Sequence, residues 1–134
     1  MSVRFAGYAA LFDRVDRGGD IVRRGAFARS LALVSEGKGA SIPLLWHHRP
    51  AARIGTVEYA AEDRRGLRII AALDADAAEP LGALRSATVT GLSFGYRVRH
   101  AQGSAPRELL DLDLVEISLV TMPMMPGAKV HMLR

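Results

Sequence analysis

The strongest strand signal in the chain spans residues 110–121, and it constrains the fold more than any other stretch. Its apolar residues are closely spaced: Leu112, Leu114, Val115, Ile117, Leu119 and Val120. A run of this kind is typical of a strand within a buried sheet. The 134 residues of the chain are enough for one domain with its own hydrophobic core. We therefore expect a single domain over residues 1–134.

Apolar patterning predicts the other elements. Further strands are expected at 3–11, 41–48, 54–60, 67–73 and 93–100, with a short last one at 129–133. The runs at 54–60 and 67–73 flank a turn and predict a β-hairpin. Helical spacing predicts helices at 25–36 and 77–87. Six or seven strands with two helices predict an α+β fold around a closed or nearly closed sheet.

Composition excludes several classes of function. The chain has no cysteine, so thiol catalysis, disulfides and cysteine-ligated zinc are excluded, and a cytosolic setting fits. No apolar run reaches membrane-spanning length, and no signal segment opens the chain. The formal net charge is +4, but the basic residues are scattered rather than gathered in a stripe. Specific nucleic-acid binding is therefore not predicted.

Residues 12–20 form a polar loop that contains three aspartates, Asp13, Asp16 and Asp20. Aspartates at close spacing suggest calcium, but the loop lacks the later glutamate that a calcium loop uses as a ligand. A solvated turn is favoured, and we predict no metal site.

Ser93 lies between two glycines in the stretch Gly91-Leu92-Ser93-Phe94-Gly95. Glycines at Gly91 and Gly95 remove side chains that would block the approach of backbone or substrate, and a serine presented this way is a candidate nucleophile. The pattern G-x-S-x-G also marks the nucleophile elbow, but that motif needs a strand before the serine and a helix after it. Here the predicted order is reversed. A small serine packed for its shape remains the alternative.

A serine nucleophile needs a histidine base, and the chain has four histidines. His100 lies roughly 23 Å from Ser93 along an extended strand, at ~3.3 Å per residue. His131 has no distinctive context. His47 and His48 end the strand predicted at 41–48, where neighbouring side chains point to opposite faces, so only one of them can serve a given site.

Glu116 is a carboxylate within the most apolar strand of the chain. Burying it there is costly unless it is paired or hydrogen-bonded. By alternation, it shares a face with Leu112, Leu114, Ser118 and Val120. A role in orienting a histidine would supply such a partner, and a solvent-facing position is the alternative.

Three blocks of sequence resemble the motifs of the phage prohead serine proteases, which act in capsid maturation and include the versions found in gene transfer agents. The blocks are Trp46-His47-His48, Thr90 to Tyr96 and Asp113 to Val120. The start of the chain, at 7–10, 16–20 and 25–27, and the pair Ile54-Gly55 resemble the family too. The blocks follow the order of the family at similar spacing.

The resemblance implies a fold like that of the herpesvirus assemblins, which is a mainly antiparallel β-barrel flanked by helices. It implies a serine endopeptidase that needs no cofactor. Ser93 aligns with the nucleophile, His48 with the base and Glu116 with the third member of the triad. Gly91, Leu92 and Gly95 are then expected to contact the substrate. His47 occupies a variable position, and Arg49 stands where the family often has an acid.

The implied substrate is the major capsid protein or the scaffold, cut inside the assembling procapsid in the cytoplasm of the bacterial host. A homo-oligomer is a further expectation. The family often has a longer, self-cleaved C-terminal region, so the chain is expected to be a short member or a trimmed product. The main alternative is a non-catalytic capsid-assembly module that holds an extended peptide by strand addition. A small nucleic-acid-binding barrel is a weaker alternative, because no row of stacking aromatics is present.

Overall fold

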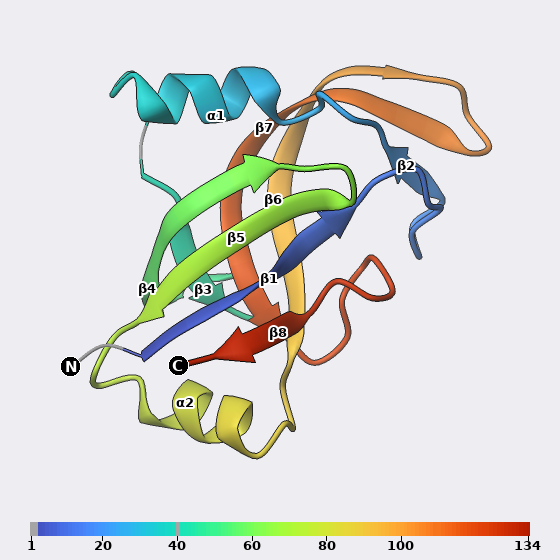
Figure 1. Ribbon diagram of the computed structural model, residues 1–134. Helices are drawn as coiled ribbons and strands as arrows, with labels where there is room; N and C mark the ends of the chain where they lie inside the picture. Colours follow the sequence, from blue (N-terminus) through green and yellow to red (C-terminus); the bar gives the residue numbers. More distant parts are fainter. Residues whose placement is uncertain (1–2, 40) are drawn as a thin grey trace.

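The computed structural model describes residues 3–39 and 41–134, and these form one eight-stranded sheet with two helices (Figure 1). In chain order, the elements are β1 Val3–Leu11, β2 Asp20–Val22, α1 Ala28–Ser35, β3 Pro43–Trp46, β4 Arg49–Glu62, β5 Gly66–Leu73, α2 Ala78–Arg85, β6 Gly91–Gln102, β7 Arg107–Val120 and β8 Val130–Leu133. None of the helices described here is both long and apolar enough to cross a membrane.

The predicted central strand, β7, is the element to which most of the sheet is joined. It pairs antiparallel with β6 along most of its length. It also pairs in parallel with β2 near its start and with β3 near its end. From β3 the sheet continues through β4, β5 and β1 to β8. Because β7 is shared by three neighbours, residues from distant parts of the chain meet along it.

The sheet differs from the predicted barrel in two respects. It is mainly antiparallel, as predicted, but it is mixed, because the β2–β7 and β3–β7 pairs are parallel. It is also not closed by a continuous ladder among the described residues. Only an isolated bridge between Gly91 and Lys129 joins the start of β6 to the segment before β8. Strand β2 was not predicted, because three residues are too few to give a period-two pattern.

The two helices lie at opposite ends of the sheet (Figure 1). Both are shorter than predicted, at 28–35 and 78–85. Helix α1 is fastened to β7, because the Ser30 hydroxyl accepts a hydrogen bond from the backbone N–H of Leu114 at 3.0 Å. The Arg29 guanidinium also pairs with Asp111 and Asp113 on β7. These contacts fix the middle of β7 beneath the helix.

From Glu116 to its end at Val120, β7 is buried on both faces. Ile117 and Leu119 are completely inaccessible, and so is Ser118 between them. Glu116 retains only 7% of its accessible surface. The solvent-facing alternative for Glu116 is therefore wrong, and the carboxylate must find its partners inside the protein.

Candidate active site

The two neighbouring histidines lie in the turn between β3 and β4 rather than on a strand. Trp46 pairs with Arg49, which leaves His47 and His48 as the two turn residues. Their φ angles are 52° and 60°. Two successive positive φ values are typical of a type I′ hairpin turn, and histidine is among the residue types that tolerate them. The strand alternation used in the sequence argument therefore does not apply, although the two rings still diverge.

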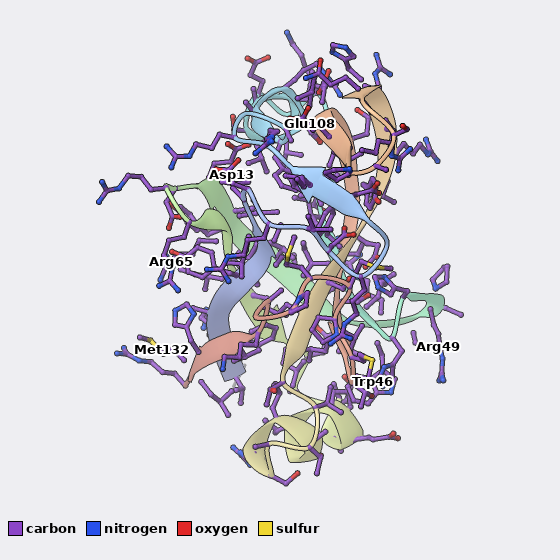
Figure 2. The ribbon with its side chains drawn as sticks, turned by 90° about the vertical axis from the view of Figure 1, so that its right-hand side faces the viewer. Asp13, Trp46, Arg49, Arg65, Glu108 and Met132 are labelled. Atoms are coloured by element: carbon purple, nitrogen blue, oxygen red, sulfur yellow. The ribbon has the colours of Figure 1, made fainter. Side chains whose placement is uncertain are left out.

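The rings of the two histidines have different neighbours. His47 packs against Trp46, with the ring centroids 4.2 Å apart and the planes at 61°. The His48 ring instead contacts β7, where its Nδ1 lies 2.5 Å from Oε1 of Glu116. Figure 2 places Trp46 and Arg49 near this turn, with Arg49 at the outer edge of the molecule. Arg49 is exposed, so the residue that stands in place of an acid is directed into solvent.

His48, Glu116 and Ser118 are joined in a closed ring of three hydrogen bonds. The backbone N–H of His48 donates to the Ser118 hydroxyl at 3.0 Å, and that hydroxyl donates to Oε2 of Glu116 at 2.7 Å. The contact between Oε1 and Nδ1 completes the ring. Both carboxylate oxygens thus have a partner, which offsets the cost of burying Glu116.

The carboxylate sets the proton state of the imidazole. The hydrogen bond to Glu116 raises the pKa of His48 above its usual 6.5, and the negative charge of Glu116 adds to this effect, whereas burial opposes it. An ionised carboxylate can only accept, so in the neutral ring the proton lies on Nδ1. The other nitrogen, Nε2, is then free to accept a proton.

Ser93 lies on β6 directly opposite Ser118 of β7 and is 5% exposed. It shares a small pocket of about 100 Å³ with His48. The other lining residues are Ala9, Asp16, Phe94, Tyr96, Met124 and Met125. Among the described residues, Ser93 and His48 form no direct hydrogen bond. Such bonds are often long before a substrate binds, so the shared pocket is the relevant observation.

The three residues expected to contact substrate have other neighbours. Leu92 is fully buried in the core, so its side chain cannot reach a ligand. A Cβ atom on Gly91 would lie 2.7 Å from the carbonyl oxygen of Val120. A Cβ atom on Gly95 would lie 2.4 Å from Oε1 of Glu116. Both glycines thus make room for the chain itself, and the expected contacts of Gly91, Leu92 and Gly95 with substrate stay a prediction.

Ser118 is the residue that sequence reasoning missed. It holds the backbone of His48 and the carboxylate of Glu116 at the same time. The sequence did carry a signal, because Ser118 is a small polar residue within an apolar run and shares a face with Glu116. Its partner in the turn was not foreseeable, because that contact depends on the parallel pairing of β3 with β7.

The aspartate loop is a hydrogen-bonded turn. Oδ1 of Asp16 accepts bonds from the backbone N–H groups of Gly18 and Asp20, at 2.8 and 3.0 Å. Across residues 3–39 and 41–134, no group of three or more histidine or acidic side chains is placed to hold a metal ion. Asp16 is partly buried and lines the pocket that contains Ser93.

Solved structures of two viral proteases share this fold. The protease of varicella-zoster virus aligns with a TM-score of 0.64 at 16% identity, covering 98% of this chain and 64% of that one. The capsid assembly protease of bacteriophage T4 aligns with a TM-score of 0.69 at 12% identity, covering 90% of this chain and 82% of that one. The fold is therefore that of a class of viral proteases.

The sequence comparisons identify the family. The family model described as caudovirus prohead serine protease matches residues 1–134. The prohead protease of Enterobacteria phage HK97 is 32% identical over 98 residues, which are 70% of this chain and 42% of that protein. The chain belongs to the caudovirus prohead serine protease family, and it spans less than half the length of this relative.

Proposed function

We propose that this chain is a serine endopeptidase with Ser93 as nucleophile, His48 as general base and Glu116 as the group that orients the base. The observation that carries the proposal is the ring of hydrogen bonds that fixes the His48 imidazole at the edge of the pocket containing Ser93. Triads are recognised by geometry and by the role of each group. Membership of the family supports the assignment.

The proposed reaction uses the two nitrogens of His48 differently. Nε2 takes the proton of the Ser93 hydroxyl while Oγ attacks the carbonyl carbon of the scissile peptide bond. Glu116 stabilises the imidazolium that forms, because its ionised carboxylate accepts the hydrogen bond from Nδ1–H. The imidazolium then gives its Nε2 proton to the leaving amine, which leaves an acyl-enzyme. A water molecule, deprotonated by His48, releases the acyl group and restores Ser93.

The proposed substrates are proteins of the immature capsid, namely the major capsid protein or the scaffold. Support comes from the prohead protease of phage HK97 and the capsid assembly protease of phage T4, which resemble this chain. Residues 1–134 would act as one domain inside the procapsid, in the cytoplasm of the host. A homo-oligomer is compatible with this setting.

A serine-directed phosphonate probe tests the proposal, because it labels only an activated serine. We expect labelling at Ser93, identified by mass spectrometry of the digested protein, and its loss in Ser93→Ala and His48→Asn. The same proteins are then incubated with capsid protein, and its new N-terminus is sequenced. A wild-type chain that resists the probe and leaves capsid protein intact would favour the non-catalytic assembly module instead.

A further inference from the structure

We propose that the pocket beside Ser93 selects a lysine or arginine side chain on the residue that supplies the cleaved carbonyl group, and that Asp16 recognises its charge. The inference rests on the proposed peptidase function and adds its substrate preference. It uses the aspartate loop, which the triad leaves without a role.

Asp16 presents one free carboxylate oxygen in a fixed orientation. Its Oδ1 is held by the backbone N–H groups of Gly18 and Asp20. Within the described part of the chain, Oδ2 has no recorded hydrogen bond. Because the turn already fixes the carboxylate, a cationic ligand would find the acceptor in place and would not have to order it.

Among the described residues, no cation forms an ion pair with Asp16. The adjacent Arg17 points its Nε at the carbonyl oxygen of Pro123, 3.0 Å away. Arg107 pairs with Asp20 at 2.9 Å. The pKa of Tyr96, another pocket residue, is raised mainly by burial and further by the charges of Asp20 and Asp16, each of which outweighs the opposing charge of Arg107. The pocket wall therefore experiences a negative potential.

The remaining walls suit an aliphatic stem that carries a positive head. Met124, Met125 and Phe94 contribute apolar surface, and Tyr96 adds an aromatic ring that can stabilise a cation. The segment that carries Met124 and Met125 is attached to the aspartate loop, because the backbone N–H of Arg17 donates to the carbonyl oxygen of Met124 at 2.9 Å. The two walls are thus held together.

The size of the pocket also fits a single side chain. Its volume of about 100 Å³ corresponds to roughly three water molecules at ≈ 30 Å³ each. A purely apolar side chain would fill the space but would remove water from Asp16 without replacing its hydrogen bonds, which is unfavourable. A glutamate would add repulsion. A basic residue avoids both penalties.

Quenched peptides that differ at one position test the preference. The residue before the scissile bond is lysine, norleucine, glutamine or glutamate. Norleucine matches the lysine stem but lacks its charge. We expect kcat/KM for lysine to exceed that for norleucine by about 10- to 100-fold, since a hydrogen bond to a charged group is worth about that factor. Equal rates for lysine and norleucine would overturn the proposal.

Asp16→Asn tests the residue itself. Asparagine keeps Oδ1 as an acceptor, so the turn should be retained, but the charge is lost. We expect the lysine-to-norleucine ratio to fall toward one. The control Asp13→Asn lies in the same loop but outside the pocket, where Asp13 pairs with Arg23, and should keep the wild-type ratio. An unchanged ratio in Asp16→Asn would remove Asp16 from substrate recognition.

Phosphonate probes with the same four side chains separate this inference from the proposed function. If Ser93 is labelled equally by all four, the peptidase assignment stands and the charge preference is refuted. If none of them labels Ser93 and no peptide is cut, the peptidase assignment fails and the preference falls with it. Labelling fastest with the lysine probe, and only when Asp16 is present, supports both.

Discussion

At the scale of single residues, Gly95 is required by Glu116. Residues 95 and 116 are opposite each other on β6 and β7. A Cβ atom at Gly95 would lie 2.4 Å from Oε1 and 2.9 Å from both Cδ and Cγ of Glu116, closer than such atoms approach. The second glycine of the serine motif therefore gives the carboxylate the space in which it meets His48.

Gly95→Ala should accordingly impair catalysis through Glu116. Displacing the carboxylate weakens its bond to Nδ1, so the pKa of His48 should fall from its raised value, and kcat/KM should drop by about 10²-fold, as for an ångström-scale misplacement. NMR titration of the histidine ring reports the pKa.

The control is Gly82→Ala, where a new Cβ meets nothing within 4 Å on helix α2. That variant should be stabilised by about 1 kcal/mol, with unchanged activity. Wild-type kinetics in Gly95→Ala would show that the Glu116 carboxylate can move aside and still keep its bond to His48.

The raised pKa of His48 also gives the pH dependence of activity a definite sign. The base must be neutral, so kcat/KM should rise with pH through the pKa of His48, above 6.5. Glu116→Gln removes the negative charge that helps to raise this pKa and leaves only a neutral acceptor, so its acid limb should move to lower pH. At neutral pH it should lose on the order of 10²–10⁴ in rate. Ser93→Ala should lose more. If the acid limb of Glu116→Gln stays at the same pH as in the wild type, the limb reports the titration of a group other than His48.

At the scale of elements, the β3–β4 turn shows where sequence reasoning stops. The apolar run before it was predicted as a strand, and β3 covers Pro43–Trp46. The turn itself was missed, because type I′ turns are usually marked by asparagine and glycine. A pair of histidines carries no such mark. The resemblance to the family singled out His48, whose ring contacts Glu116, but it could not give the backbone conformation that turns the ring there.

The same substitution at both turn positions should separate the two histidines. Asparagine tolerates positive φ, so His47→Asn and His48→Asn should each keep the turn. His47→Asn loses only the packing against Trp46 and should retain most peptidase activity. His48→Asn removes the proposed base and should reduce kcat by several orders of magnitude. Peptide cleavage, with circular dichroism to verify folding, measures both. The reverse ranking would make His47 the base.

At the scale of the whole molecule, the strands were predictable but their pairing was not. Apolar alternation located seven of the eight strands that residues 3–39 and 41–134 form, since it reports which residues face the core. It carries no information about which strand lies beside which. The parallel pairing of β3 with β7 brings Leu45 opposite Ser118, far away in the sequence. The hydrogen-bonded ring depends on this pairing, so the role of Ser118 could be recognised only from the structure.

The ion pair in that ring should also affect the stability of the whole chain. The pKa of His48 is raised in the folded state. Its protonated form therefore adds stability that is fully present below the unfolded pKa, about 6.5. This stability is lost as the pH rises through the higher folded pKa. Urea unfolding of the wild type and of His48→Asn between pH 5.5 and 9 measures the effect. The difference in unfolding free energy between the two proteins should shrink as the pH rises and then level off. The other three histidines occur in both proteins, so their titration cancels in the difference. A difference independent of pH would mean that Glu116 does not favour the charged imidazole in the folded protein.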